Sequence, residues 1–217
     1  LDFAGRGLEM LDPLPHVGEV INGDDYERVT RLFKELRSEI VRRAQLFAEA
    51  RTSSMGGYRT ASPDGATLPR LVILLDGYDN FTAAYESIDR GTWVDLLPRL
   101  VADGRAVGVH FVLTGSRRTS FPMALSGLIS TRLVFRMASS DDYHSVNADP
   151  TWFDQTTPPG RCRLGDVEVQ IAVLGTSAET GEEARAFQRL GAALERILAP
   201  APPIRVLPHR LTLDELR

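Results

Sequence analysis

The apolar residues of this chain follow two spacings, and each spacing predicts a different kind of element. Between residues 24 and 47 they recur every three or four positions, which is typical of one face of a helix. Asp24, with Glu27 three residues later, is typical of an N-cap followed by a capping box. Leu71–Leu75 and Val109–Thr114 are short apolar runs, as in strands buried on both faces of a parallel sheet. The chain is therefore predicted to combine helices with buried strands.

Further segments continue this alternation. We expect a helix in Trp93–Ala102, a short helix in Met123–Ile129 and a third strand in Leu133–Met137. Strands that alternate with helices predict parallel β/α units. Ser, Gly, Thr and Pro dominate residues 52–67, which predicts a loop.

After residue 158 the apolar period changes to two. Val167–Val173 alternates apolar and polar residues and predicts a half-exposed strand. With Arg161–Arg163 it is expected to form a β-hairpin that turns at Leu164–Asp166. A last helix is predicted in Glu182–Leu198, and the Pro-rich segment that begins at Ala199 indicates a stiff, extended linker.

Composition narrows the functional classes only slightly. A net charge of −4 argues against attraction of the whole surface to nucleic acid, although a local basic stripe stays open. Cys162 is the only cysteine, so an internal disulfide framework is excluded and a cytoplasmic location is expected. The apolar runs are shorter than the roughly 20 residues that a bilayer-spanning helix needs. The scattered histidines do not predict a metal site.

Polar residues follow two of the predicted strands. Asp76 closes one strand, and ligands of open α/β sheets bind beyond the carboxyl ends of strands. A carboxylate there could hold the Mg²⁺ that bridges two phosphates of a nucleotide. Thr114 ends the other strand and could sense a phosphate, with Arg117 just beyond it. Arg105 lies between a helix and a strand and could reach a neighbouring subunit's phosphate. For each residue an ordinary structural role is the alternative.

The phosphate-binding loop of such a nucleotide site needs the pattern G-x-x-x-x-G-K-[ST]. Lys34 is the only lysine of the chain, and it lies in a helical stretch with no glycine-rich run before it. These 217 residues therefore lack that loop.

Several segments, in this order, resemble the FtsK/SpoIIIE family of motor ATPases and are most similar to its EccC-type members of type VII secretion. They are Leu1–Leu8, Leu14–Gly18 (LPHVG), Leu74–Gly77 on the Walker B strand, Gly104–His110 (GRAVGVH), Thr114–Arg118, Thr131–Arg136, Pro159–Arg161, and Pro203–Pro208 with Leu213–Leu216.

The resemblance implies a RecA-like α/β fold of the P-loop NTPase class with a mostly parallel sheet, truncated at its N-terminus, plus a C-terminal β-hairpin and helix. Residues 1–198 would form the ATPase domain and residues 199–217 a linker between modules. The phosphate loop is expected upstream of the strand that ends at Leu1–Phe3. ATP and Mg²⁺ would bind in the intact parent protein.

The family's site residues carry over to positions of this chain. Asp76 would hold Mg²⁺ through water, Gly77 would lie beside the nucleotide, and Thr114 would be the polar sensor. Arg105 and Arg117 are candidate arginine fingers that act on a neighbouring subunit. The family's Asp-Glu pair is Asp76-Gly77 here, and loss of a general base typically costs about 10²–10⁴-fold in rate. Asp79 lies three residues beyond Asp76 and is expected to point elsewhere.

The resulting hypothesis is an ATPase module of a multi-domain protein-export motor with weak or regulatory hydrolysis. Its partners would be other ATPase modules, in a hexameric ring, and a secreted protein; other parts of the parent would tether it to the membrane. One alternative is a DNA translocase, although the chain lacks basic pore loops and a winged-helix reader. The other is a scaffold that does not hydrolyse ATP and binds a partner's peptide in a hydrophobic pocket.

Overall fold

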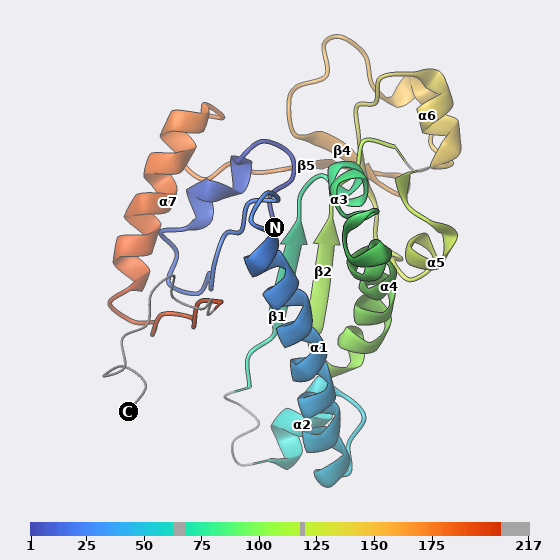
Figure 1. Ribbon diagram of the computed structural model, residues 1–217. Coiled ribbons are helices and arrows are strands. Elements are labelled where there is room, and N and C mark those ends of the chain that lie inside the picture. Colours follow the sequence, from blue (N-terminus) through green and yellow to red (C-terminus); the bar gives the residue numbers. More distant parts are fainter. Residues whose placement is uncertain (63–67, 118–119, 205–217) are drawn as a thin grey trace.

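The computed structural model describes residues 1–62, 68–117 and 120–204 (Figure 1). The described helices are α1 (Tyr26–Glu49), α2 (Met55–Ala61), α3 (Tyr78–Tyr85), α4 (Thr92–Gly104), α5 (Met123–Ser126), α6 (Ser140–Ser145) and α7 (Thr180–Leu194). The described strands are β1 (Leu71–Leu75), β2 (Val109–Leu113), β3 (Leu133–Phe135), β4 (Arg161–Leu164) and β5 (Val167–Gln170). The mixed α/β class predicted from the sequence is confirmed.

A parallel pair of strands forms the centre of the fold. β1 and β2 pair in register from Leu71 opposite Val109 to Leu75 opposite Leu113. The N-terminal segment runs parallel to the end of β1, because Asp76 donates its N–H to Leu1 and Phe3 donates to Asp76, at 3.0 and 2.9 Å. The predicted end of a strand at Leu1–Phe3 thus pairs beside β1.

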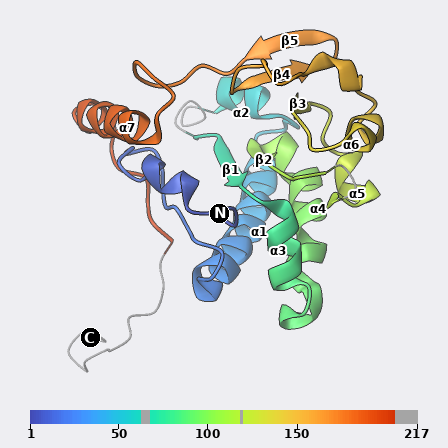
Figure 2. The ribbon, with the colours of Figure 1, turned by 90° about the horizontal axis from the view of Figure 1, so that it is seen from above.

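Helices cover one face of this pair. Figure 2 shows α1, α3 and α4 together on one side of β1 and β2, and their apolar residues form the main core with Leu75 and Val109. On the opposite face Val72 is 57% and Val112 is 52% exposed. The prediction that both strands are buried on both faces is therefore wrong in this structure, because the described helices that contact the pair lie on one side.

The third predicted strand does not join the parallel pair. β3 pairs antiparallel with β4, and β4 pairs antiparallel with β5, in a separate three-stranded sheet. The predicted hairpin is confirmed, and its turn contains Gly165 at a φ of 58°. The prediction of a third parallel unit is wrong because the antiparallel hairpin supplies the partner of β3.

α1 is the helix that the apolar spacing predicted, with its start one residue later. Its N-cap is Asp25 rather than Asp24, and the Asp25 carboxylate accepts the N–H of Arg28 at 3.1 Å. Its buried face follows the expected spacing from Val29 to Phe47, but it also contains Arg43, which is only 1% exposed.

Residues 52–67 were predicted to be a loop, but they contain α2. Ser54 caps this helix by accepting the N–H of Gly57 at 3.1 Å, and Met55 and Tyr58 are buried on one face. Tyr58 stacks on Phe47 of α1 with ring centroids 4.8 Å apart. The helix was not predicted because small polar residues surround its two buried apolar residues, Met55 and Tyr58. Residues 63–67 of the predicted loop lie outside the described residues.

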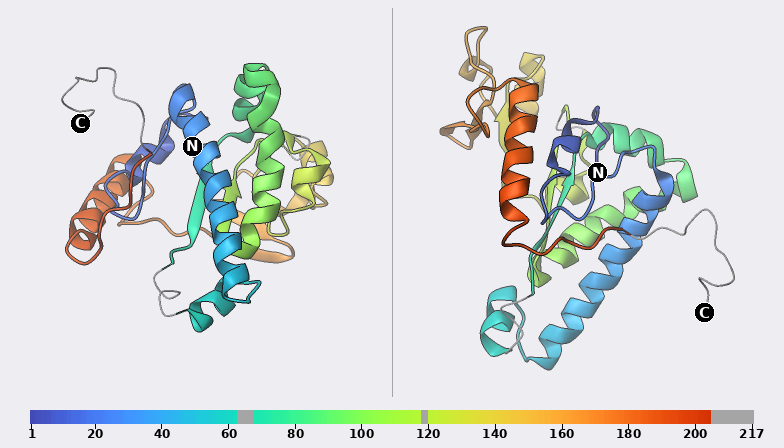
Figure 3. Two further views of the ribbon diagram at one scale, coloured as in Figure 1. Left: turned by 60° about the horizontal axis from the view of Figure 1, so that its bottom comes forward. Right: turned by 90° about the vertical axis from the view of Figure 1, so that its left-hand side faces the viewer.

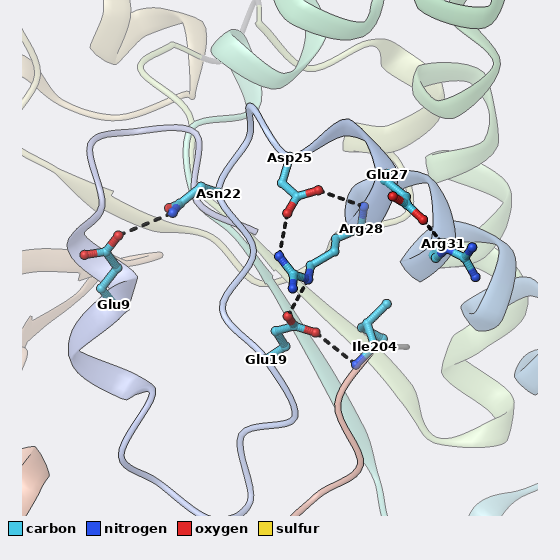
Figure 4. A network of polar contacts seen from close by, with 8 residues as sticks. All are labelled: Glu9, Glu19, Asn22, Asp25, Glu27, Arg28, Arg31 and Ile204. Carbon is cyan, nitrogen blue, oxygen red and sulfur yellow. Dashed lines mark hydrogen bonds and ion pairs between the residues drawn. The ribbon is translucent and has the colours of Figure 1, made fainter. Parts of the chain in front are cut away.

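The segment that follows α7 packs back onto the start of the chain. Ala201 donates its N–H to the carbonyl of Pro15 at 2.7 Å. Figure 4 shows the Arg28 guanidinium between Asp25 and Glu19, and the second oxygen of Glu19 accepts the N–H of Ile204 at 2.9 Å. The first part of the predicted linker is therefore fixed to α1 through Glu19, and residues 205–217 lie outside the described part.

α7 lies on the other side of the strands from α1 and α4 (Figure 3). It packs against the 3₁₀ turn Gly7–Leu11, and a Cβ added at Gly191 would come within 2.2 Å of the Pro13 carbonyl oxygen. Within the described residues, no helix has both the length and the apolar character needed to cross a bilayer.

Candidate functional site

Asp76 and Thr114 follow the carboxyl ends of β1 and β2. Because Leu75 lies opposite Leu113, the parallel register places the two residues side by side at one edge of the sheet. Thr114 is exposed and Asp76 is half-buried, so both are open to a ligand above that edge. In open α/β sheets this edge is where ligands bind.

The Thr114 hydroxyl connects the ends of the two strands. It donates to Asp76 Oδ1 at 2.5 Å and accepts the N–H of Gly77 at 2.8 Å. The Thr114 carbonyl accepts the N–H of Tyr78, also at 2.8 Å. The structure therefore brings the residue predicted to hold Mg²⁺ into direct contact with the residue predicted to sense phosphate.

The Asp76 carboxylate suits Mg²⁺ better as one ligand among phosphates and waters than as part of a protein cage. Its Oδ2 makes no hydrogen bond to the described residues, so one carboxylate oxygen stays open. No group of three or more His, Cys, Asp or Glu that could hold a metal occurs among residues 1–62, 68–117 and 120–204. Mg²⁺ usually takes one or two carboxylates and completes its shell with water and substrate phosphates.

Gly77 has a backbone conformation that a glutamate would strain. Its φ is 83°, in the left-handed region. A Cβ built there would lie 3.1 Å from the carbonyl carbon of Phe3 and 3.2 Å from Cβ of Ala4. The backbone at position 77 therefore suits glycine and disfavours the glutamate of the family's Asp-Glu pair.

The Asp79 carboxylate is occupied by hydrogen bonds from Ser116, which lies two residues beyond Thr114. Its Oδ2 accepts the N–H of Ser116 at 2.8 Å and the Ser116 hydroxyl at 3.1 Å. Burial raises the pKa of Asp79, but hydrogen bonds from Ser116 and Ser120 outweigh it and bring the pKa below its ordinary value. A carboxylate that is tied down and hard to protonate is a poor general base.

Asp2 is a structural residue of this edge that the sequence analysis missed. The residue is 4% exposed, and its carboxylate accepts the backbone N–H groups of Ala4, Gly5, Arg6 and Leu8. Burial raises the pKa of Asp2, but these hydrogen bonds outweigh it and lower the pKa below its ordinary value. The available signal was an Asp at the end of a strand, directly before a glycine-rich loop.

The two candidate arginine fingers lie at opposite edges of the sheet. Arg117 follows Thr114 on the Asp76 side, is exposed, and lies 3.9 Å from the carboxylate of Asp142. Arg105 precedes β2 and therefore lies at the amino-terminal edge. β1 and β2 have five residues each, and the six steps of chain from Arg70 to Asp76 span about 20 Å. Arg105 therefore cannot reach Asp76 of its own domain.

Lys34 does not contribute to the site. It lies on α1 with its ammonium group 5.8 Å from the centroid of the Trp93 ring. The interpretation of Lys34 as an ordinary helix residue is consistent with this position.

Comparison with known proteins identifies the family. The FtsK/SpoIIIE family model matches residues 1–149. The chain is 28% identical to the ESX-1 secretion system protein EccCb1 of Mycobacterium tuberculosis (strain ATCC 25618 / H37Rv), covering 100% of this chain and 37% of that protein. It is 30% identical to the ESX secretion system protein EccC of Thermomonospora curvata, covering 100% of this chain and 17% of that protein.

Solved structures agree with this assignment. ATPases 2 and 3 of Thermomonospora curvata EccC, in complex with a signal sequence peptide, match with a TM-score of 0.81 at 25% identity, over 99% of this chain and 39% of that chain. ATPases 2 and 3 of EssC from Geobacillus thermodenitrificans have the same fold, with a TM-score of 0.80 at 24% identity over 98% of this chain and 40% of that chain. The chain thus spans well under half the length of the relatives it matches, and it belongs to the FtsK/SpoIIIE family.

Proposed function

We propose that this chain is one ATPase module of a multi-module type VII secretion motor, which binds Mg²⁺·ATP and turns it over slowly. The observation that carries the proposal is the contact of Asp76, Thr114 and Gly77 at the carboxyl edge of β1 and β2. Asp76 would hold Mg²⁺ through water, and Mg²⁺ would neutralise charge on the phosphates. Thr114 would orient Asp76 and sense the bound phosphate.

The phosphate-binding loop would come from polypeptide outside these 217 residues. Two features support this part of the proposal. Val72 and Val112 are exposed on the face opposite the helices. Within the described residues β2 pairs only with β1, and β3 pairs only with β4, so each strand has an unpaired edge. A strand, phosphate loop and helix supplied by the parent protein would cover such a face and edge.

Catalysis would be completed by a neighbouring module. Arg105 lies at the edge opposite Asp76, so we assign it to the site of an adjacent module rather than to its own. Arg117 follows Thr114 by three residues on the Asp76 side, so we assign it to a nucleotide bound to its own module. Hydrolysis would be slow because Gly77 offers no general base and Asp79 is tied to Ser116.

The test uses a chain extended upstream by a strand, loop and helix of the parent. Titration with a fluorescent ATP analogue, with and without Mg²⁺, measures the affinity. We expect Asp76→Asn to remove most of the Mg²⁺-dependent gain in affinity. Asp103→Asn is the matched control, since Asp103 is an exposed acid of α4 away from this edge. Equal Mg²⁺ dependence in both variants would refute the role of Asp76.

The second candidate is a scaffold that binds a secreted partner's peptide and does not turn over nucleotide. Two observations favour it: EccC of Thermomonospora curvata has been solved with a signal sequence peptide bound, and Gly77 replaces the general base with a residue that cannot take a proton. Fluorescence anisotropy with a labelled secretion-signal peptide tests it. Saturable peptide binding by an extended chain that binds no ATP would favour this candidate, and a salt-steep affinity for duplex DNA would favour a translocase instead.

A further inference from the structure

Residues 199–204 form a strap that follows α7 and packs on the start of the chain through few contacts. Three of its six residues are prolines, which have no N–H to donate. Ala201 donates its N–H to the Pro15 carbonyl at 2.7 Å, and Ile204 donates to Glu19 at 2.9 Å. The Ile204 side chain packs against the main core. A segment held by two hydrogen bonds and one apolar side chain can open locally, without unfolding of the domain.

Glu19 connects this strap to the start of α1. One of its carboxylate oxygens accepts the N–H of Ile204, and the other lies 2.8 Å from Nε of Arg28 (Figure 4). The Arg28 guanidinium also donates to Oδ2 of Asp25 at 2.7 Å, and Asp25 caps α1. Arg28 is therefore shared between the carboxylate that holds the strap and the carboxylate that begins the helix.

Glu19 also leads into the segment that pairs with Asp2. Asp2 donates its N–H to the carbonyl of Ile21, and its own carbonyl accepts the N–H of Gly23, both at 2.8 Å. On its other side Asp2 forms a parallel bridge with Asp76. Contacts therefore run without a break from the strap, through Glu19 and Asp2, to the residue that we propose holds Mg²⁺.

The packing along this path is close at both ends. At the strap, a Cβ added at Gly18 would lie 3.0 Å from the carbonyl oxygen of Pro202. At the other end, a Cβ added at Gly23 would lie 2.2 Å from the Phe3 ring. Phe3 in turn donates its N–H to the Asp76 carbonyl at 2.9 Å. Because close-packed contacts transmit displacement, a shift of the strap is passed on to the Asp76 edge.

We infer that the ion pair of Glu19 and Arg28 couples the strap to the Asp76 edge, so that docking of the strap and binding of Mg²⁺·nucleotide strengthen each other. This inference rests on the proposed function for the ligand at Asp76. The docked strap fixes the segment that pairs with Asp2, and a ligand at Asp76 fixes the same strand end from the other side. Because coupling between two binding events is reciprocal, each event favours the other. Glu19 and Arg28 act as positioning residues and do not contact the ligand.

Hydrogen exchange of single amides, measured by NMR on the 217-residue chain, tests the connection without nucleotide. Arg28→Gln removes the ion pair with Glu19 but keeps the backbone N–H that Asp25 accepts. Release of the strap should raise the exchange rate at Ile204 about fivefold, and the rate at Gly23 should rise with it. A faster rate at Ile204 with an unchanged rate at Gly23 overturns the inference, because the strap would then open independently of the Asp76 edge.

A variant of the strap itself separates its release from any damage to α1. Ala201→Pro removes the N–H that Pro15 accepts and leaves the pair of Glu19 and Arg28 in place. A proline suits this position because the residue before Pro202 is already biased toward extended backbone. The exchange rate at Gly23 should rise in this variant as well, and an unchanged rate likewise overturns the inference.

The upstream-extended chain tests the coupling to the ligand. The affinity for a fluorescent ATP analogue with Mg²⁺ should fall about fivefold in Arg28→Gln. Arg31→Gln is the control of equal charge change in both assays, because Arg31 pairs with Glu27 on the same helix, and it should match wild type. Saturating analogue should slow exchange at Ile204 in wild type but not in Arg28→Gln, a reciprocity that a merely structural role does not produce.

The outcomes separate this inference from the proposed function. Equal affinities of Arg28→Gln and Arg31→Gln for the analogue overturn the inference while the proposed function stands. A wild-type extended chain that binds no nucleotide sinks the proposed function, and the exchange rate at Gly23 in the 217-residue chain still decides whether the strap and the edge are connected.

Discussion

Restoring the family's Asp-Glu pair by Gly77→Glu should fail, because the fold itself excludes a side chain at this position. Gly77 has a φ of 83°. Its Cβ would point at the backbone of Phe3 and Ala4, where the three nearest atoms lie 3.1 to 3.3 Å away. That backbone is held on both sides: Phe3 O accepts from Asn80 at 2.8 Å, and Ala4 N–H donates to Asp2 at 3.1 Å. The neighbours therefore cannot move away cheaply.

Two costs add at Gly77. A side chain held in the left-handed region costs about 1–2 kcal/mol, and crowding of a packed site costs about 1–3 kcal/mol. We expect Gly77→Ala to lower the free energy of unfolding by about 3 kcal/mol, which is roughly 6–12 °C in Tm for a domain of this size. Gly77→Glu should cost at least as much.

Gly165 provides the matched control. It also has a positive φ, 58°, but a Cβ there would meet nothing within 4 Å. Gly165→Ala therefore carries only the backbone cost, about 1–2 kcal/mol. Thermal unfolding followed by circular dichroism, with urea titration to check that the m-value is unchanged, measures the difference between the two variants.

The reasoning is refuted if Gly77→Ala and Gly165→Ala have the same Tm, because crowding at Phe3 and Ala4 would then be absent. A second refutation comes from activity. In the upstream-extended chain, Gly77→Glu should not raise ATP hydrolysis, whereas a competent general base is worth about 10²–10⁴-fold. A rise of that size would show that the backbone at Gly77 can accept a catalytic side chain.

Further predictions concern the framework around this edge. Asp2→Asn should lower the free energy of unfolding at neutral pH by about 2 kcal/mol. Because the pKa of Asp2 is depressed in the folded state, the stability that its carboxylate contributes is lost as pH falls below about 4. Urea titrations should therefore show a smaller difference between Asp2→Asn and wild type at pH 3 than at pH 7. Thr114→Val should cost about 1–2 kcal/mol in the same assay, with Thr114→Ser close to wild type. Arg43→Met leaves buried carbonyls unpaired and should cost about 3 kcal/mol, measured by thermal unfolding. Val72→Ser and Val112→Ser should each change the stability of this chain by under about 0.5 kcal/mol, yet destabilise the upstream-extended chain by more.

Local patterns predicted the elements that pack through their own periodicity. The spacing from Val29 to Phe47 placed α1, and the continuous apolar runs placed β1 and β2. The change to period two placed the β4–β5 hairpin and its turn. These signals suffice because each element buries a regular face, so its own sequence records the pattern. The edge that holds Asp76 and Thr114 followed from the same strands, since both residues come directly after a strand end.

Those local patterns could not predict contacts between segments that are distant in the sequence. Arg43 lies on the apolar face of α1, although its charge predicts an exposed position. It is buried because its guanidinium donates hydrogen bonds to two carbonyls that lie 26 and 64 residues away in the sequence. The partner of β3 was mispredicted for a similar reason, since helix–strand alternation does not specify which strand edges meet. α2 went unrecognised because it has seven residues and only two of them, Met55 and Tyr58, are buried, which is too few to show a periodic apolar face.

The arrangement of charge along β1 and β2 connects these observations. Carboxylates lie at the carboxyl edge, in Asp76 and Asp79, and the exposed Arg105 lies at the amino-terminal edge. A single domain cannot use both for one phosphate group, because the strands hold the edges about 20 Å apart. Under the proposed function, Asp76 of one module and Arg105 of the next would act on the same nucleotide. The proposed function therefore requires that modules assemble before both residues can act on one nucleotide.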